Sequence, residues 1–397
     1  MGEWVEKRIS EIALVTMGQS PTSDSYNENG DGLPFLQGNR TFGAKYPTFD
    51  TFTTAPNKIA DANDVIMSVR APVGDLNITP VKMCLGRGVC SLKPQNGNSQ
   101  FLFYLMKCHV PIMLSRSNGT VYDSINRTDI EKTKVLVPAN NSTQTRIADI
   151  LSAYDDAIEN NNRRIALLEK AARELYREWF VRIRFPGHES VRIVNGLPEG
   201  WEVVPLECVV NITSSKRSYE SERVDFGTPL YRSKEIIQIY SGEEITDPLF
   251  ISEEWFAMIR DKFGAPKEND ILITSRGTIG VPFLVDKRIF YFSDGNLTWL
   301  QSSERPEMAL YLYFWIDSPM GQGAISSSTI GTSQKALPIE TLKKVKLVKP
   351  VDNVLSLFHR NMMSCIELKR NLRKQSQNLD RQRDLLLPRL MSGKLEV

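Results

Sequence analysis

Apolar residues recur at alternating steps of four and three along two long stretches of this chain. Such heptad spacing predicts the seam of a coiled coil. The first seam has one polar position and consists of Ile147, Leu151, Tyr154, Ile158, Asn161, Ile165, Leu168, Ala172, Leu175 and Trp179. The second has several and consists of Val354, Phe358, Asn361, Cys365, Leu368, Leu372, Gln375, Leu379, Gln382 and Leu386.

Local signals set the expected limits of the two helices. Ser142 or Thr143 is suited to cap the first helix, and Pro186-Gly187 to end it. Asp352 is suited to cap the second helix, and Pro388 to end it. At 1.5 Å per residue the first seam spans roughly 50 Å.

The second seam is too polar to be stable alone in water, so we expect the two helices to pair within the chain. A pseudo-twofold axis across the pair makes the helices antiparallel, and an axis along it makes them parallel. The short connector, residues 186–200, favours the antiparallel coiled coil. The alternative is two ordinary amphipathic helices, each folded onto its own module, but the heptad persists for more than four repeats in both.

The sequence before each helix is repeated after about 210 residues. Asn63 to Gly74 returns as Asn269 to Gly280, with Arg70 and Arg276 at the same place. A repeat of this length indicates two whole domains rather than a solenoid. We therefore predict an α+β fold with two similar modules, each with a mostly antiparallel sheet, and a pseudo-twofold internal repeat.

The predicted elements divide the chain as follows. We expect strands at 64–70, 89–93, 134–138, 270–276, 281–285 and 345–349, and buried helices at 101–107 and 308–315. The expected divisions are module 1 at 1–140, a helix at 141–185, a linker at 186–200, module 2 at 201–350, a helix at 351–388 and a tail at 389–397.

Composition narrows the class of protein. The chain has 397 residues, of which 41% are apolar and 24% charged, as in soluble globular proteins. It shows no apolar run of the ~20 residues that cross a bilayer and no secretory signal at its start. Five scattered cysteines and three isolated histidines favour free thiols in the cytoplasm over disulfides or a metal site. Because the net charge is only +2, any positively charged surface that binds DNA must be confined to part of the molecule.

The combination of features resembles the specificity (S) subunits of type I restriction–modification systems. The resemblance rests on the module–helix–module–helix order, the repeated Asn-Asp–apolar–Arg–Gly segment, the Gly196 to Trp201 stretch and the ending Asp384 to Gly393. It covers essentially the whole chain. One departure is Pro138 to Gln144, where the family often has a Pro-Pro-x-x-Glu-Gln segment.

This resemblance implies a non-catalytic subunit with two target-recognition domains. Each would read one half of a bipartite, asymmetric site in double-stranded DNA, with the helices as a ruler for the unread spacer. It also implies docking of two methyltransferase (M) subunits and of restriction (R) subunits. S-adenosylmethionine, ATP and Mg²⁺ would act on those partners, with no cofactor on this chain.

Comparison of the two modules suggests which residues contact DNA. Arg70 and Arg276 are present in both copies, which fits a phosphate contact, or alternatively a structural role, better than base reading. Base readers should differ between copies and lie in polar loops, although each candidate has the alternative of being a solvated loop residue. The candidates are Gln37, Asn39, Arg40, Lys45, Arg87, Arg116, Ser117 and Asn118, and Lys216, Arg217, Tyr219, Arg232, Lys234, Thr278, Ser333, Gln334 and Lys335.

Two other functions compete with this hypothesis. A self-contained DNA-modifying enzyme would need motifs that the sequence lacks, including a G-x-x-x-x-G-K-[S/T] phosphate loop and the Asn/Asp-Pro-Pro-aromatic tetrapeptide of amino-methyltransferases. A coiled-coil adaptor that binds only protein would show no sequence-dependent affinity for duplex DNA.

Overall fold

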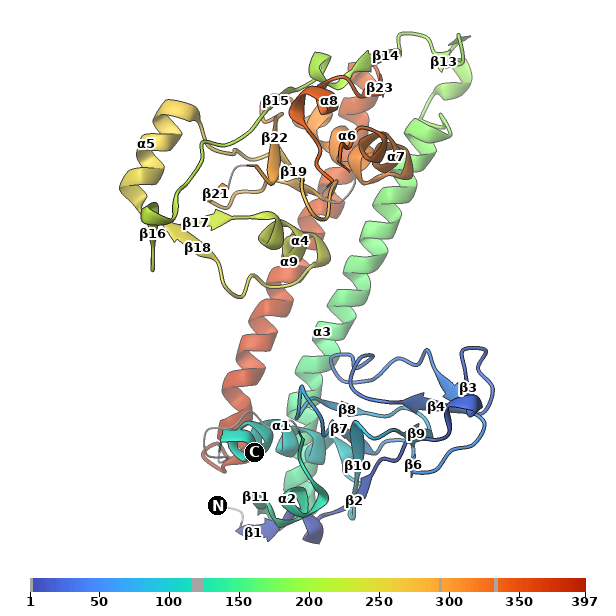
Figure 1. The fold of residues 1–397 in the computed structure, drawn as a ribbon, viewed down its shortest axis with the longest axis vertical. Coiled ribbons are helices and arrows are strands. Elements are labelled where there is room, and N and C mark those ends of the chain that lie inside the picture. The colour runs from blue at the N-terminus through green and yellow to red at the C-terminus, as the bar shows by residue number, and fades with distance from the viewer. Residues whose placement is uncertain (1–2, 116–123, 293–294, 332–334) are drawn as a thin grey trace. The chain divides into compact units, whose positions relative to one another are not determined.

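The structure is a computed structural model that describes residues 3–115, 124–292, 295–331 and 335–397 (Figure 1). The chain forms two compact units. Unit 1 comprises residues 1–164 and 371–397, and unit 2 comprises residues 165–370. Each unit therefore contains one module together with a part of each long helix.

Unit 1 is built on two small sheets and a terminal strand pair. The inner sheet is antiparallel, in the order β2 (Ala13–Met17), β10 (Val89–Pro94), β7 (Val65–Ser68), β8 (Leu76–Ile78). The outer sheet has the order β3 (Tyr26–Asn27), β5 (Phe52–Thr53), β4 (Leu33–Leu36), β9 (Met83–Leu85), β6 (Ile59–Ala60), with β4 and β9 parallel. Strand β1 (Trp4–Arg8) pairs with β11 (Lys134–Pro138), and the helices of the module are α1 (Ser99–Ser115) and α2 (Arg127–Lys132).

Among the described residues, unit 2 repeats this topology, except that its outer sheet has no counterpart of β6. Its inner sheet has the order β15 (Asn211–Thr213), β22 (Leu297–Gln301), β19 (Ile271–Thr274), β20 (Pro282–Leu284). Its outer sheet has the order β16 (Arg223–Val224), β18 (Leu249–Ile251), β17 (Thr228–Tyr231), β21 (Tyr291–Phe292), with β17 and β21 parallel. Strand β14 (Glu202–Pro205) pairs with β23 (Lys346–Lys349). The helices are α4 (Ser233–Ser241), α5 (Glu253–Phe263), α6 (Pro306–Asp317), α7 (Pro319–Ser327) and α8 (Ile339–Lys343).

This shared topology confirms the predicted α+β fold with two similar modules. The predicted strands and buried helices coincide with β7, β10, β11, β19, β20, β23, α1 and α6. Their ends agree to within two residues, except that α1 continues eight residues beyond the predicted end at residue 107. The core of unit 1 packs α1 against the inner sheet, where Tyr104 and Met67 are almost completely buried. In unit 2, Tyr311 of α6 and Ile273 of β19 belong to the equivalent core.

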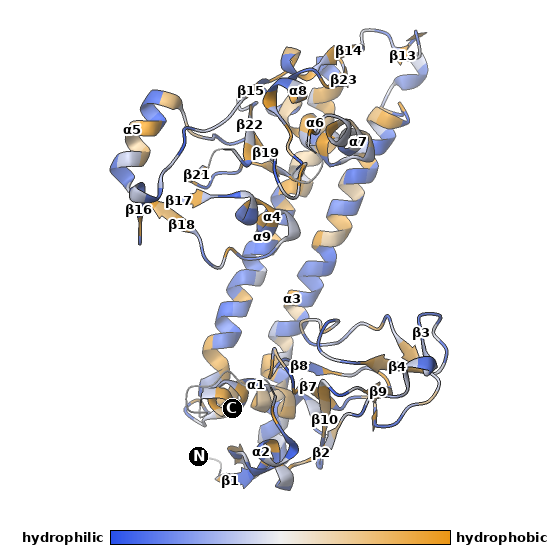
Figure 2. Ribbon diagram, viewed as in Figure 1, coloured by the Kyte–Doolittle hydropathy of each residue, from blue (hydrophilic) through white to orange (hydrophobic). Residues whose placement is uncertain are grey.

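The two long helices, α3 (Asn141–Tyr176) and α9 (Asp352–Met391), pack together as an antiparallel pair, as predicted. Within unit 1, Asn161 donates a hydrogen bond to Gln375 over 3.3 Å. Within unit 2, Lys369 forms an ion pair with Glu169 at 3.0 Å. As residue numbers rise along α3, the numbers of the partner residues on α9 fall, so the two helices run in opposite directions. Figure 2 shows both helices largely hydrophilic, with apolar residues interspersed along them.

Four expected helix limits were wrong. Asp352, the expected cap of the second helix, is the first residue of α9 and pairs with Arg305 at 2.8 Å. Asn140 caps α3, since its Oδ1 accepts a 2.9 Å hydrogen bond from the Ser142 amide, in place of Ser142 or Thr143. The helical stretch that begins with α3 ends in a π-helical turn at Val181, before Pro186. Helix α9 continues through Pro388 to Met391. A proline so near the end of a helix removes one backbone hydrogen bond, and burial of the neighbouring Leu390 and Met391 holds this last turn in place.

Among the described residues, no helix is long and apolar enough to cross a membrane. In the same part of the chain the five cysteines are free, and no cluster of three or more histidine, cysteine or acidic side chains could hold a metal ion.

Candidate nucleic-acid interface

In unit 1, three turns meet at one edge of the inner sheet. The turn after β7 carries Arg70 and begins at Val69, whose amide bonds to the Gly88 carbonyl over 2.8 Å. The Val69 carbonyl in turn accepts a 2.9 Å hydrogen bond from the Ile125 amide, and Arg70 forms a backbone bridge with Ser124. This arrangement brings Arg70 beside the β9–β10 turn, which carries Arg87.

The segment after β4 joins the same edge. The Gly88 amide bonds to the Gln37 carbonyl over 2.9 Å, and Asn39 donates a 2.5 Å hydrogen bond to Asp75, in the turn that carries Arg70. A Cβ atom on Gly88 would lie 2.5 Å from that carbonyl oxygen, so the close approach requires glycine. The structure therefore brings Gln37, Asn39, Arg70 and Arg87 together.

The charged side chains at this edge are available to an anionic ligand. Arg70 and Arg87 are exposed. Arg40 is paired with Asp50 at 2.7 Å, and its hydrogen bond holds the pKa of Asp50 below the usual value. The Arg40 and Asp50 side chains are 74% and 50% exposed, so their pairing contributes little stability and can give way to a phosphate contact. Exposed arginines and amides are suited to phosphate and base contacts respectively.

Unit 2 builds the same edge with the same backbone pattern. The Ser275 amide bonds to the Asn296 carbonyl over 2.8 Å, and the Ser275 carbonyl accepts a 2.9 Å hydrogen bond from the Leu337 amide. Arg276 forms a backbone bridge with Ala336, as Arg70 does with Ser124. The exposed candidates at this edge are Lys234, Arg276, Thr278 and Lys335. Ser233 fixes the start of α4 to it through a 3.0 Å hydrogen bond to the Asn296 carbonyl.

Two sets of candidates make contacts with other residues of unit 2. Arg232 forms an ion pair at 2.6 Å with the fully buried Glu235, which also caps α4 by accepting a hydrogen bond from the Arg232 amide. Lys216, Arg217 and Tyr219 lie exposed in the loop after β15. The Arg217 guanidinium stacks over the Tyr219 ring at 5.3 Å, and the Lys216 amide donates to the Tyr291 hydroxyl. Among the described residues, the hydrogen bonds and ion pairs of this loop do not reach the edge that carries Arg276.

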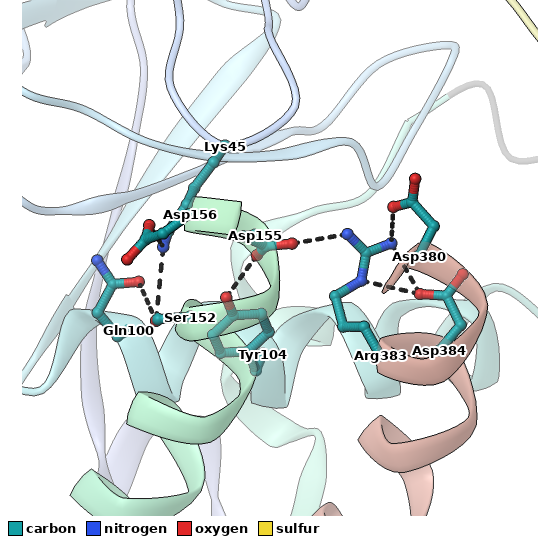
Figure 3. Close-up of polar contacts among 9 residues, drawn as sticks. All are labelled: Lys45, Gln100, Tyr104, Ser152, Asp155, Asp156, Asp380, Arg383 and Asp384. Atoms are coloured by element: carbon teal, nitrogen blue, oxygen red, sulfur yellow. Dashed lines mark hydrogen bonds and ion pairs between the residues drawn. The ribbon is translucent and has the colours of Figure 1, made fainter. Parts of the chain in front are cut away.

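Lys45 differs from the other candidates because it is buried, with only 7% of its surface exposed. Its ammonium lies 3.5 Å from the Ser152 hydroxyl and 3.8 Å from the Asp156 carboxylate, both on α3 (Figure 3). The remaining candidates, Arg116, Ser117, Asn118, Ser333 and Gln334, lie outside the described residues.

Several residues that shape the interface escaped the sequence argument. Asp75 orients Asn39, and Ser20 donates a 2.9 Å hydrogen bond to the Gln37 side chain. Neither residue belongs to the matching part of the repeat. Asp75 directly follows Gly74 of the repeated segment, and this position was the one sequence feature that could have pointed to it.

Comparison with known proteins places the chain in a family. Residues 1–170 and 198–354 match the family described as type I restriction modification DNA specificity domain. The type I restriction enzyme MjaIX specificity subunit of Methanocaldococcus jannaschii is 25% identical over 414 residues, which cover 100% of this chain and 94% of that relative. A second specificity-subunit sequence from that organism is 40% identical over 175 residues, which cover 44% of this chain and 41% of that relative.

A solved structure shows the same fold. The crystal structure of a type I restriction–modification system S subunit from M. genitalium superposes with a TM-score of 0.63 at 16% identity, over 98% of this chain and 96% of that chain. The family match covers most of both modules, and both modules share one scaffold. The chain therefore belongs to the family of type I restriction–modification specificity subunits, a non-catalytic family whose members carry two target-recognition domains.

Proposed function

We propose that this chain reads a bipartite, asymmetric site in double-stranded DNA, with one half-site for each module. The observation that supports this most directly is the repeated edge, where Arg70 and Arg276 occupy the same backbone position. Shared arginines are suited to phosphates, which carry no sequence information. Around them stand different polar side chains, such as Gln37 and Asn39 in unit 1 and Lys234 and Thr278 in unit 2. Different readers on one scaffold would recognise different bases.

The paired helices are proposed to set the number of unread base pairs. Helix α3 has 36 residues and α9 has 40. At 1.5 Å per residue these correspond to about 54 and 60 Å, enough to bridge half-sites one helical turn of DNA apart, about 34 Å. Inserting equal lengths into both helices should then lengthen the preferred spacer while the bases read in each half-site stay the same.

Catalysis is assigned to other polypeptides. We propose that the chain docks methyltransferase (M) subunits, which use S-adenosylmethionine, and restriction (R) subunits, which use ATP and Mg²⁺. The support is membership in a non-catalytic specificity family. In this scheme the chain recognises the DNA sequence, and the partner subunits catalyse the reactions.

A selection experiment tests the recognition function. The full-length chain, alone and with its methyltransferase subunit, is incubated with randomised DNA duplexes, and bound duplexes are sequenced. Two motifs separated by a fixed unread gap are expected. Replacing residues 1–140 by the matching block of a relative should change one motif and leave the other intact. Binding without sequence enrichment, or both motifs changing together, would rule out the proposal.

A further inference from the structure

Each module has one segment that leaves the outer sheet, passes the candidate interface and returns to the sheet. In unit 1 this segment is residues 37–51, between β4 and β5, and in unit 2 it is residues 232–248, between β17 and β18. We name these the reading segments. They carry Gln37, Asn39 and Arg40 in unit 1 and Lys234 in unit 2. Although their sequences and conformations differ, both are fastened through a buried charged group to the same helix, α3.

In unit 1 the fastening is Lys45. Its ammonium lies between Ser152 and Asp156 of α3 at 3.5 and 3.8 Å (Figure 3). It also lies within 6 Å of the ring centroids of Tyr46 and Tyr104. A buried ammonium is costly unless polar or aromatic groups surround it. These groups therefore fix where the Lys45 side chain, and with it the reading segment, can lie.

The backbone around Lys45 is held as well. The Lys45 carbonyl accepts a 2.8 Å hydrogen bond from the Ile78 amide of β8. The buried Asn77 side chain donates to the Gly43 carbonyl over 2.8 Å and accepts from the Gly43 amide over 3.1 Å. The middle of the segment is thus fixed to the inner sheet on one side and to α3 on the other.

The part of α3 that receives Lys45 is itself immobilised. Asp155, next to Asp156, accepts hydrogen bonds from the Tyr104 hydroxyl at 2.5 Å and from Arg383 of α9 at 2.6 Å. Ser152 also donates to Gln100 of α1 over 3.3 Å. Figure 3 shows Lys45 and Arg383 reaching this turn of α3 from two different directions. The turn of α3 that receives Lys45 is therefore held by contacts with both α1 and α9.

In unit 2 the fastening is Tyr240, in the last turn of α4. Its hydroxyl donates a 2.5 Å hydrogen bond to Asp317, at the end of α6, and Arg173 of α3 donates to the other carboxylate oxygen over 2.8 Å. The Asp317 side chain is 7% exposed. Burial, together with the Asp317 hydrogen bond, raises the pKa of Tyr240 to about 12, so the hydroxyl keeps its proton and remains a donor at neutral pH.

We propose that Lys45 and Tyr240 are positioning residues that hold the two reading segments against α3, so that base discrimination in each module depends on its attachment to this helix. The inference rests on the proposed DNA-reading function. Two unrelated chemistries, an ammonium in unit 1 and a phenol–carboxylate–guanidinium chain in unit 2, perform the same task at the same place in the repeated topology. Each reading segment would then be oriented by the part of α3 that belongs to its own unit.

The test uses the full-length chain and the randomised-duplex selection. Lys45→Met removes the ammonium and keeps the aliphatic stem, and Tyr240→Phe removes only the hydroxyl. Each variant should lose discrimination in one half-site, about tenfold for Lys45→Met and somewhat less for Tyr240→Phe, within the range carried by a base contact. The other half-site should keep its wild-type preference in each case.

A second set of variants separates positioning from direct contact with DNA. Removing the α3 side of the fastening with Ser152→Ala and Asp156→Asn should reproduce the effect of Lys45→Met, and combining all three changes should add nothing further. Lys93→Met is the matched control, because Lys93 forms an exposed ion pair with Asp61 in the same unit. It should leave both motifs unchanged.

The outcomes are distinguishable. If the wild-type chain enriches no motif, the proposed function fails. If it enriches two motifs and Lys45→Met keeps both with full discrimination, the positioning role is overturned. It is also overturned if the α3 variants leave the first motif intact while Lys45→Met erases it, since Lys45 would then contact DNA itself. A third refuting result is that Lys45→Met weakens both motifs alike, since that marks a general requirement for folding.

Discussion

Arg383→Met should loosen unit 1 and leave unit 2 unaffected. The Arg383 guanidinium on α9 donates a 2.6 Å hydrogen bond to Asp155 on α3, and the two side chains are only 13% and 12% exposed. Removing the arginine leaves the Asp155 carboxylate buried with the Tyr104 hydroxyl as its remaining donor in Figure 3. Breaking a buried ion pair from one side is far more costly than losing an exposed one.

The expected loss is about 3 kcal/mol, the lower end of the range for removing one partner of a buried pair. The lower end applies because Tyr104 still donates to Asp155. For a unit of about 190 residues, 3 kcal/mol corresponds to a fall of about 6–12 °C in the temperature of unfolding. Arg163→Met, which breaks an exposed ion pair with Glu159 on the same helix, should cost less than about 1 kcal/mol.

Hydrogen exchange followed by mass spectrometry of peptides can locate the effect, because the chain has two units that need not unfold together. Exchange should accelerate in residues 141–164 and 371–391 and stay unchanged in β19 and β22. Adding Asp155→Leu should recover much of the loss, since an apolar pair can replace a buried ion pair. Adding Tyr104→Phe should recover more, because the Tyr104 hydroxyl would otherwise lack an acceptor. A loss below about 1 kcal/mol for Arg383→Met, or equal acceleration in β19, would refute this reasoning.

Three further predictions concern DNA affinity, pH and packing. Arg70→Ala and Arg276→Ala should each weaken binding to all duplexes alike and lower the slope of log affinity against log salt by about 1, measured by fluorescence anisotropy; a change in the preferred bases would exclude a phosphate role. Burial raises the pKa of Asp64, so the folded state binds this proton more tightly than the unfolded state. The resulting stability is present below the unfolded pKa and is lost as pH rises through the folded pKa. Relative to Asp64→Asn, the wild type should therefore gain unfolding free energy in urea as pH falls, and a constant difference would contradict this. Leu151→Ala should cost about 2–5 kcal/mol in urea unfolding because Leu151 is fully buried, whereas Leu167→Ala, at a position 66% exposed, should cost less than about 0.5 kcal/mol.

The repeat and the heptads predicted the fold because both depend on spacing that the sequence displays directly. Identical spacing around Arg70 and Arg276 reflects one strand-and-turn built twice, and the structure gives both arginines equivalent backbone bridges. Helix ends were less predictable. Pro388 is a strong stop signal in isolation, but the tertiary burial of Leu390 outweighs one missing hydrogen bond.

The candidate interface was predictable only in part. Loop position and residue type selected Gln37, Asn39 and Arg87, which the structure brings together at one edge. The same criteria selected Lys45, whose burial depends on Ser152, more than a hundred residues away in sequence. Such long-range partners leave no periodic signal. Tyr240 was missed for the same reason, since its partner Asp317 lies on another helix.

The composition of unit 1 has a consequence for how the chain is made. This unit combines residues 1–164 with residues 371–397, and Leu390 and Met391 of α9 lie in its core. Trp4 packs so closely on Gly393 that a Cβ atom there would lie 2.6 Å from the indole nitrogen. Ribosomes release a chain from its N-terminal side onward, so residues 1–164 emerge before residues 371–397, which contribute to the same core. Unit 2, whose residues 165–370 are contiguous, has all its parts available earlier.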